Sequence, residues 1–402
     1  MILSSWSYSE PLIHSYLLPN ACIIRDIISR DSVLFVQTSE GNPGVMTNEQ
    51  RNEARQSLSE FNIQWLPLKH RRFGMRALFA YCGQLLMLVR FIRKQKIDVI
   101  HSFAPAAGTM ALILKFLTGK KLVIDSWEPH AESMVETGVW KKNSFAFRIL
   151  WWSEKMQARK ADVLIAASPG MIEYARNAYG VEAKNVHVRP ACVDMVLFNP
   201  NRFDHHAIRA KMNVETKIVC ACVSKLGGLY LKQEVFELFK IGADVFGEKF
   251  HVLLLSPNSK GEVLGLCKDS GFLARQLTHV SVPHTLVPEY LSACDFAFNP
   301  QQPVPSKRFG TPVKDGEYWA MGLPIMILPE ISEDSSIVLN ENVGVILQNL
   351  EESAMRKSMS NMKSLLESKL VNKEHVRNIA KKYRSYEIAK KVYQEVYGNG
   401  SV

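Results

Sequence analysis

Long apolar runs are absent from this sequence of 402 residues. No stretch approaches the roughly 20 consecutive apolar residues that a membrane-spanning helix needs. The first residues, Met1–Leu12, also lack the basic leader and apolar core of a secretory signal. We therefore expect a cytoplasmic protein without a membrane-spanning helix.

Closely spaced cysteines and low-complexity segments are also missing. The seven cysteines are scattered, with no C-x-x-C pair, so we expect reduced thiols in the core and neither disulfides nor a cysteine metal site. Hydrophobic residues make up 47% of the chain and charged residues 22%. This balance is that of a globular protein, and the length allows about two domains.

Positive charge is in excess, with a formal net charge of +10. Such an excess fits three classes of partner: nucleic acid, an anionic membrane and phosphate-bearing substrates. No recognised nucleic-acid-binding motif accompanies the charge, so we expect no nucleic-acid partner.

Short apolar runs alternate with helical periodicity along most of the chain, a pattern typical of α/β folds with parallel sheets. The runs that predict buried strands are Ser32–Gln37, Asp98–Ser102, Lys121–Asp125, Ala161–Ser168, Val186–Pro190, Ile218–Val223, His251–Leu255, Val280–Val282, Asp295–Phe298 and Ile325–Leu328.

A polar, proline-containing link at Asn199–Asp204 divides these runs into two series. We predict an N-terminal domain over 1–198 and a C-terminal domain over 199–384. The tail 385–402 has helical periodicity and is expected to cross back to the first domain. Two doubly wound domains that face each other would bind ligands at the carboxyl ends of their strands.

The most informative segment is Thr311–Glu330, TPVKDGEYWAMGLPIMILPE, which predicts a loop, a short helix, a tight turn and a buried strand. Lys314 and Glu317 lie at the start of the helix, where free N–H groups and the helix dipole attract anions. A lysine there suits phosphate, and a carboxylate one turn on suits the paired hydroxyls of a ribose. The plainer interpretation is a solvated helix start with a Lys–Glu pair.

This segment resembles the donor-binding motif of family 4-like glycosyltransferases. Further segments resemble the same family in the same order: Lys160–Ser168, the link from Pro190 to Pro200, Val223–Tyr230 and His284–Asp295. The resemblance runs from about residue 98 to the end and implies a GT-B fold, in which two Rossmann-like domains face each other across a cleft.

The resemblance also implies a function. It is transfer of a sugar, hexosyltransferase-type and with retention, from a nucleotide sugar to a glycan or lipid-linked acceptor, without cofactor or obligatory metal. The expected pathway makes surface polysaccharide or glycolipid, at the inner face of the membrane. One departure concerns the donor sugar: Phe309 stands where many members carry a second acidic residue.

The residues proposed for the donor nucleotide are Lys225, Gly227, Gly228, Lys314 and Glu317. Lys225 and the two glycines follow a predicted strand, where a charge and close backbone N–H groups suit a diphosphate. A surface lysine in a glycine turn is the alternative. Arg308 flanks the Phe309 position and is a possible sugar or acceptor contact.

The residues proposed for catalysis are Asp125, Glu128 and His130, in a loop that follows a buried strand. The family often keeps a histidine or an acidic residue in this loop, near the transferred sugar, with Asp125 here as an orienting partner. The alternative is helix capping by Glu128 with Pro129 in the first turn. His101, after another strand, is a possible acceptor or sugar contact or a structural histidine.

Basic residues beside aromatic ones occur at His70–Arg76 and from Trp140 to Trp152. They suit the surface of an anionic bilayer, suit RNA less well, or merely end helices that bury their apolar faces.

Two alternatives to a glycosyltransferase stay open. One is a nucleotide-sugar epimerase or hydrolase on the same fold. The other, from a different class, is a non-catalytic two-domain sugar-binding protein.

Overall fold

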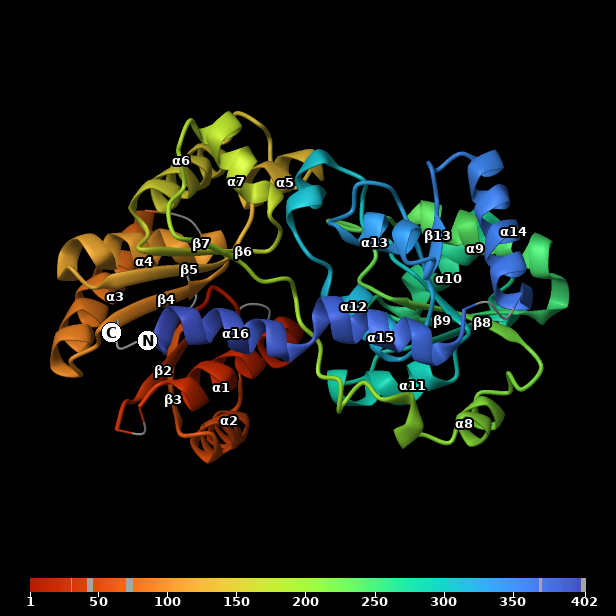
Figure 1. Cartoon of the computed structure of the whole chain (residues 1–402), viewed down its shortest axis with the longest axis horizontal. Coiled ribbons are helices and arrows are strands. Elements are labelled where there is room, and N and C mark those ends of the chain that lie inside the picture. Colours follow the sequence, from red (N-terminus) through yellow and green to blue (C-terminus); the bar gives the residue numbers. More distant parts are fainter. Residues whose placement is uncertain (30, 42–45, 70–74, 369–370, 399–402) are drawn as a thin grey trace. The chain divides into compact units, whose positions relative to one another are not determined.

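The computed structural model describes residues 1–29, 31–41, 46–69, 75–368 and 371–398. The chain forms two compact units (Figure 1). The first comprises residues 1–135, 140–190 and 387–402, and the second residues 136–139 and 191–386.

The first unit contains a seven-stranded parallel sheet in the order β3-β2-β1-β4-β5-β6-β7. Its strands are β1 (Ile2–Leu3), β2 (Leu34–Glu40), β3 (Ile63–Lys69), β4 (Val99–Phe103), β5 (Lys121–Trp127), β6 (Val163–Ala166) and β7 (Val186–Val188). Its helices include α1 (Leu18–Ile27), α2 (Asn48–Glu60), α3 (Met75–Lys94), α4 (Ala104–Thr118), α5 (His130–Glu136), α6 (Phe145–Lys160), α7 (Gly170–Tyr174) and α16 (Tyr386–Tyr397).

The second unit contains a six-stranded parallel sheet in the order β10-β9-β8-β11-β12-β13. Its strands are β8 (Ile218–Val223), β9 (Phe250–Leu255), β10 (Leu277–Val280), β11 (Phe296–Phe298), β12 (Ile325–Ile327) and β13 (Gly344–Ile346). Its helices include α8 (His205–Lys211), α9 (Gln233–Phe246), α10 (Lys260–Ser270), α11 (Val287–Ser292), α12 (Val313–Ala320), α13 (Asp334–Asn340), α14 (Glu352–Ser368) and α15 (Lys373–Arg384).

The two sheets share one topology. In each, the strand order reverses beside the first strand, between β1 and β4 and between β8 and β11. This is the order of a doubly wound Rossmann-like sheet, which binds ligands at the carboxyl ends of the strands near the reversal. The predicted α/β class and the Rossmann-like character of both domains are therefore confirmed.

Strand recognition succeeded where apolar runs are continuous, because a central parallel strand buries both faces. β8 has the predicted bounds, Ile218–Val223, and every residue of β9 is buried. Three strands were missed: β1 and β13 are too short to show a pattern, and β3 contains Pro67. A proline is tolerated in β3 because this strand lies at the edge of the sheet.

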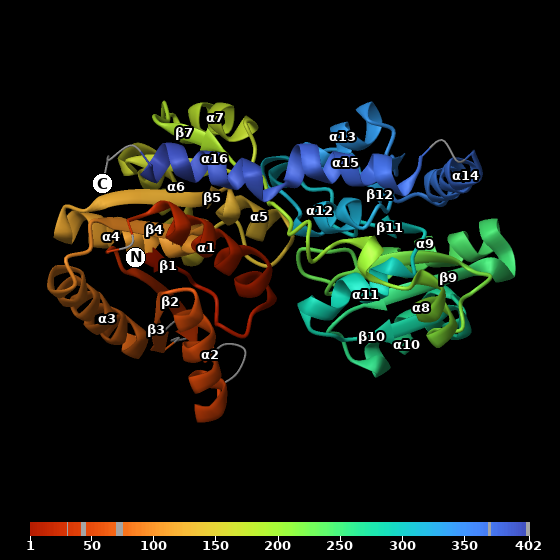
Figure 2. The same ribbon diagram turned by 60° about the horizontal axis from the view of Figure 1, so that its bottom comes forward.

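The second unit begins before the link at Asn199–Asp204, since Val193 and Phe198 pack in the core of that unit. The C-terminal helix, in contrast, belongs to the first unit from residue 387 onward. Figures 1 and 2 show α16, at the blue end of the chain, beside the red and orange elements of the first unit. Tyr393 and Tyr397 on α16 are buried there.

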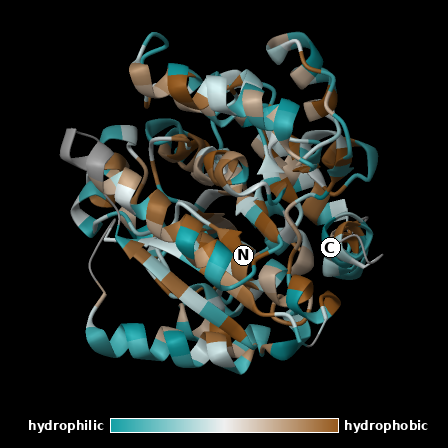
Figure 3. Cartoon of the chain, turned by 90° about the vertical axis from the view of Figure 1, so that its left-hand side faces the viewer, coloured by the Kyte–Doolittle hydropathy of each residue, from teal (hydrophilic) through white to brown (hydrophobic). Residues whose placement is uncertain are grey.

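Figure 3 shows brown and teal residues mixed on several helices, as expected where a helix turns an apolar side inward and a polar side outward. α6, for example, buries Leu150, Ser153 and Ala158 and contacts α4.

Candidate functional site

The helix predicted from the segment after Thr311 is α12, and Lys314 lies in its first turn. Lys314 Nζ donates to the Tyr230 hydroxyl at 3.3 Å and lies 4.5 Å from the centre of the Tyr230 ring. Burial alone would lower the pKa of Lys314, but Tyr230 and Glu317 raise it above its ordinary value. Lys314 therefore stays cationic at the start of a helix, the position that favours an anion.

Glu317 lies one turn further along α12 and is 5% exposed. Its Oε1 accepts a 2.6 Å hydrogen bond from His284 Nε2. Among the described residues, His284 is the only donor to this carboxylate, so Oε2 accepts no hydrogen bond from them. Oε2 is also not one of the fully enclosed atoms.

The loop after β8 holds three more of the predicted donor residues. Lys225 is exposed, whereas Gly227 and Gly228 have φ angles of 83° and 67°, a region that favours glycine. The Gly227 N–H is used within the loop, because it donates to the Leu231 carbonyl at 3.3 Å. The Gly228 carbonyl accepts from Gln302 Nε2 at 2.8 Å. The loop is thus shaped by its own hydrogen bonds.

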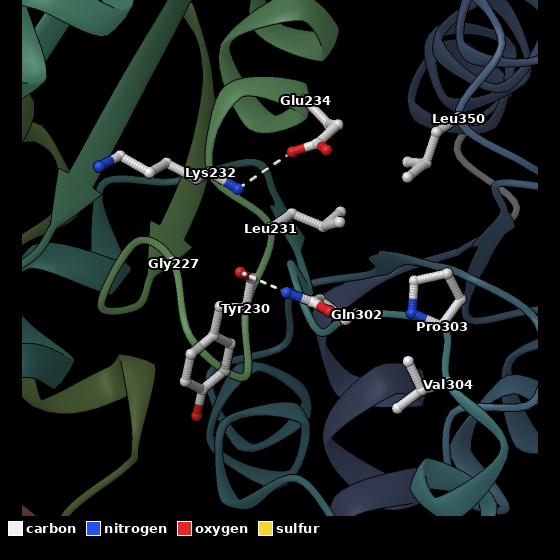
Figure 4. Close-up of a pocket in the computed structure, with 9 residues that line it drawn as sticks. All are labelled: Gly227, Tyr230, Leu231, Lys232, Glu234, Gln302, Pro303, Val304 and Leu350. Carbon is white, nitrogen blue, oxygen red and sulfur yellow. Dashed lines mark hydrogen bonds between the residues drawn. The ribbon is translucent and has the colours of Figure 1, made fainter. Parts of the chain in front are cut away.

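A cavity of about 340 Å³ lies beside this loop in the second unit. Its lining combines Gly227 and Tyr230 with residues from the loops after β11 and β13, among them Gln302, Val304 and Leu350. Figure 4 shows Gln302 bonded to the Tyr230 backbone and the Tyr230 phenol directed away from Leu350 and Pro303. The phenol points away from these residues, and its hydroxyl accepts the hydrogen bond from Lys314. Tyr230 therefore links the glycine loop to α12.

Asp315, beside Lys314, faces the interior and is fully buried. Both of its oxygens accept hydrogen bonds from Asn299 Nδ2, at 2.9 and 2.7 Å. Burial raises the pKa of Asp315 to about 7. This side chain supports the start of α12 from inside the unit.

In the first unit, Asp125 is fully buried at the centre of a hydrogen-bond network. Oδ1 accepts from Arg189 Nη2 and from the Ser126 N–H, both at 2.6 Å. Oδ2 accepts from the Tyr393 hydroxyl at 2.6 Å and from His101 Nε2 at 3.2 Å. A carboxylate offers about four acceptor positions, so these four donors occupy its capacity.

The same contacts determine which groups of this network are charged. Burial alone would raise the pKa of Asp125, but the Arg189 guanidinium and the bonds from His101 and Tyr393 hold it well below its usual range. Burial lowers the pKa of His101, so its ring is neutral. His101 Nε2 then donates to Asp125, and Nδ1 accepts from the Tyr397 hydroxyl at 2.6 Å.

The two other residues proposed for catalysis follow this network along the chain. His130 begins α5, and its Nδ1 lies 3.7 Å from Glu128 Oε1, with both side chains partly exposed. None of the described hydrogen bonds of Asp125 goes to His130. Asp125 instead holds the Ser126 N–H, and Ser126 has a left-handed φ of 52°. The structure thus joins Asp125 to His101 and leaves His130 and Glu128 as a separate pair.

Glu154 of α6 binds the backbone at the start of α5. Glu154 Oε1 accepts from the Ala131 N–H and Oε2 from the Tyr179 hydroxyl, both at 2.9 Å. Burial raises the pKa of Glu154 well above its ordinary value. The backbone on either side of Glu128 and His130 is therefore fixed by buried carboxyl groups.

Arg308, the last of the predicted contacts, lies in the short helix Pro305–Phe309. Its Nη2 is 2.7 Å from Glu330 Oε2, and the two side chains are 46% and 67% exposed. The structure records Arg308 in a surface ion pair within the second unit.

Four residues that bond to the predicted site residues were not proposed from the sequence: Tyr230, His284, Arg189 and Tyr393. Tyr230 and His284 lie inside segments that resemble the family, and that is the signal that was available. Arg189 follows the short strand β7, and Tyr393 lies in a helical tail. Neither pattern shows which side chain each of them contacts. Their partners are far away in the sequence, as in the bond from Tyr393 to Asp125.

In the described part of the chain, no three His, Cys, Asp or Glu side chains form a group that could hold a metal ion. No described helix combines the length and apolar character that crossing a bilayer requires.

Residues 33–192 match the family described as "Glycosyl transferase 4-like domain". No curated protein matches the chain. Among solved structures, HepE from Anabaena in complex with UDP has 14% identity, a TM-score of 0.71 and coverage of 98% of each chain. WaaG, a glycosyltransferase involved in lipopolysaccharide biosynthesis, has 12% identity, a TM-score of 0.71 and coverage of 100% of each chain.

A sucrose-phosphate synthase from Thermosynechococcus elongatus has 14% identity, a TM-score of 0.73 and coverage of 98% of each chain. At such identities these likenesses establish the fold, a GT-B arrangement of two Rossmann-like domains. The family match confirms the resemblance to family 4-like glycosyltransferases and spans most of the first unit. It begins before residue 98, where the resemblance was expected to start, and does not reach Thr311–Glu330.

Proposed function

We propose that this chain, which carries a glycosyltransferase 4-like domain over residues 33–192, transfers a sugar from a nucleotide-sugar donor to an acceptor. One observation carries the proposal: α12 presents a half-buried cation, Lys314, and one turn further on a carboxylate, Glu317, whose Oε2 accepts no hydrogen bond from the described residues. That pair suits a diphosphate joined to a ribose.

The donor site belongs to the second unit. Lys314 and the first turn of α12 bind the diphosphate, and Glu317 Oε2 accepts from ribose hydroxyls. The structures of HepE with UDP and with UDP-glucose support a donor of this class on this fold. Lys314 stabilises the leaving diphosphate as its charge develops. Lys225, which is exposed, adds charge from the glycine loop.

The first unit positions the sugar or the acceptor through His130 and Glu128. A neutral imidazole hydrogen-bonds sugar hydroxyls, and the leaving diphosphate takes the acceptor proton, so the protein's contribution is mainly orientation. The reaction proceeds with retention and without an obligatory metal. Turnover that persists in excess EDTA is the expected result, and strict dependence on an added divalent cation contradicts this part of the proposal.

Calorimetry with UDP, GDP and ADP tests the donor site directly. Glu317→Ala is expected to weaken binding of the preferred nucleoside diphosphate by about tenfold or more, because a charged hydrogen bond is lost. Lys314→Gln is expected to weaken the diphosphate more than the free nucleoside. Wild-type protein that binds none of these nucleotides contradicts the proposed function.

His130→Ala tests the role assigned to the first unit. Turnover is expected to fall strongly, while affinity for the nucleoside diphosphate stays near wild type, because the nucleotide contacts come from the second unit. Equal losses in turnover and affinity would show that His130 supports the fold instead.

Product analysis separates transfer from the two alternatives. A glycosyltransferase forms a new glycoside only when acceptor is present. An epimerase or hydrolase converts the nucleotide sugar without acceptor, and a non-catalytic binding protein leaves it unchanged.

The acceptor is a glycan or a lipid-linked glycan for surface polysaccharide or glycolipid, met at an anionic membrane surface. α6 supports this part of the proposal, because Phe145, Ile149 and Trp152 lie on one side of the helix and are 68%, 38% and 58% exposed. The exposed cations on and beside this helix are Lys141, Lys142, Arg148, Arg159 and Lys160. Aromatic residues among cations suit the interface of an anionic bilayer.

Co-sedimentation with phosphatidylglycerol vesicles tests the membrane contact. Reversing charge at Lys141, Lys142 and Arg148 is expected to cost about 1 kcal/mol of binding per residue, whereas Lys184→Glu, elsewhere on the first unit, serves as the control. Arg71 and Arg72, which also suit a membrane, lie outside the described residues, and Arg76 lies in α3. Unchanged sedimentation, or salt-sensitive binding to RNA in place of vesicles, contradicts the membrane contact.

A further inference from the structure

The pair formed by His284 and Glu317 is the tightest contact at the predicted ribose site. His284 begins a short helix, His284–Leu286, that precedes α11. Its Nε2 donates to Glu317 Oε1 at 2.6 Å, the short distance of a charge-assisted hydrogen bond. The Glu317 side chain is 6% exposed and the His284 side chain 20%. The carboxylate is therefore held by a side chain that is itself mostly buried.

The surroundings of His284 favour its charged form. Burial alone would lower the pKa of His284, but the bond to Glu317 and the nearby charges of Glu317 and Asp194 raise it above its ordinary value. The ring also packs against Phe198, with the centroids 5.4 Å apart. A ring fixed by these contacts gives Glu317 one orientation.

The consequence lies in how the two carboxylate oxygens are used. Oε1 is occupied by His284, whereas Oε2 accepts no hydrogen bond from any described residue and is not fully enclosed. A carboxylate that could rotate freely would present either oxygen in many directions. With Oε1 fixed, Oε2 has a single position from which to accept a ligand hydroxyl.

We propose that His284 is a positioning residue for nucleotide recognition: by holding Glu317 Oε1, it aims Oε2 at the ribose and makes the site select ribose over 2′-deoxyribose. This proposal rests on the proposed function, because it assumes that a nucleotide lies against α12. It adds a residue and a selectivity that the donor site does not need for phosphate binding alone. His284 acts through Glu317 and need not touch the sugar.

The preference for ribose over 2′-deoxyribose follows from the cost of leaving a buried acceptor without a hydrogen bond. When a site is built to accept from a hydroxyl, an analogue without that hydroxyl leaves the buried acceptor unpaired. We therefore expect wild-type protein to bind a ribonucleoside diphosphate at least about tenfold more tightly than its 2′-deoxy counterpart, the size of one charged hydrogen bond.

The experiment measures this ratio by calorimetry, with UDP and 2′-deoxy-UDP, or with the matching GDP or ADP pair if the wild type prefers it. His284→Ala is expected to bring the ratio close to one, as Glu317→Ala does, and the double variant is expected to lower it no further. His284→Gln keeps a donor near the position of Nε2 and is expected to retain part of the ratio.

Two further variants serve as controls. His284→Leu fills the space without a donor and is expected to match His284→Ala, so a folding defect of the alanine variant does not end the test. His375→Ala removes another half-buried histidine of the second unit, which bonds to the Glu341 carbonyl at 3.1 Å. It is expected to leave the ratio unchanged.

The outcomes separate the two proposals. If wild-type protein binds no nucleotide, the proposed function fails. If it binds nucleotides and His284→Ala or His284→Leu keeps the wild-type ratio, the positioning role of His284 is overturned while the donor site stands. A wild-type ratio near one also overturns the ribose selectivity.

Discussion

Each unit buries an aspartate with an arginine nearby, but the surroundings shift the pKa of the two carboxyl groups in opposite directions. Asp125 in the first unit and Asp315 in the second are both fully buried. The contacts of Asp125 hold its pKa well below the usual range. Burial raises the pKa of Asp315 to about 7. Equal burial thus leads to opposite protonation behaviour.

The difference lies in the donors. Asp125 accepts from Arg189 directly, at 2.6 Å, and from three further donors. Asp315 accepts from the neutral amide of Asn299, while Arg384 forms an ion pair with Asp334. A direct cation and a full set of donors offset desolvation, whereas a neutral donor does so only in part.

The largest effect is expected from Asp125→Ala. This change leaves the fully buried Arg189 without its carboxylate partner, and an uncompensated buried charge costs about 3–5 kcal/mol. Urea unfolding followed by tryptophan fluorescence, to which the buried Trp127 of the first unit contributes, measures the loss. A loss below that of Tyr393→Phe would show that the ion pair contributes little.

Asp315→Asn is expected to change how stability depends on pH. The folded pKa of about 7 lies above the ordinary 3.8, so the group stabilises the fold below about pH 4 and this stability is lost as pH rises to about 7. The variant is therefore expected to be more stable than wild type at pH 8. Relative to the variant, wild type loses up to about 1.4 kcal/mol per pH unit in that window.

Thermal unfolding of both proteins between pH 4 and pH 8 measures this crossover. A variant that is less stable than wild type by the same amount at every pH would show that Asp315 is ionised throughout and paired as well as Asp125.

Tyr393→Phe removes one of the four donors to Asp125 and is expected to cost about 1.5–3 kcal/mol, the range for a hydrogen bond to a charged group. Tyr397→Phe is the matched control, because Tyr397 donates to the neutral ring of His101. We expect it to cost about 1 kcal/mol. Equal losses would indicate that packing of α16, and not the charge of Asp125, sets the effect.

The smallest effect is expected from Arg308→Gln, in the exposed pair with Glu330. Surface pairs contribute about 0–1 kcal/mol, so the unfolding midpoint should hardly move. Turnover in the same variant tests the predicted sugar contact. Wild-type turnover as well as wild-type stability would assign Arg308 to the surface alone.

The class of fold and the place of the donor motif follow from local patterns in the amino-acid sequence. Continuous apolar runs are legible because parallel strands bury both faces, and the helix bearing Lys314 and Glu317 was located because its start and its Gly322 turn are local signals. In the second unit this holds for β8, β9, β11 and β12, whereas β13 was missed and β10 covers Leu277–Val280 and not the predicted Val280–Val282.

Which polar groups form hydrogen bonds with one another depends on the packing of elements that are distant in the sequence. Asp125 was predicted to orient His130, yet its acceptors are filled by Arg189, His101, Tyr393 and the Ser126 N–H. Likewise, His284 reaches Glu317 across 33 positions of sequence. Such bonds depend on how strands and helices pack, and one sequence without its packing carries no periodic signal for them. The hydrophobic pattern specifies the elements, whereas the pairing of buried charges is set when those elements come together.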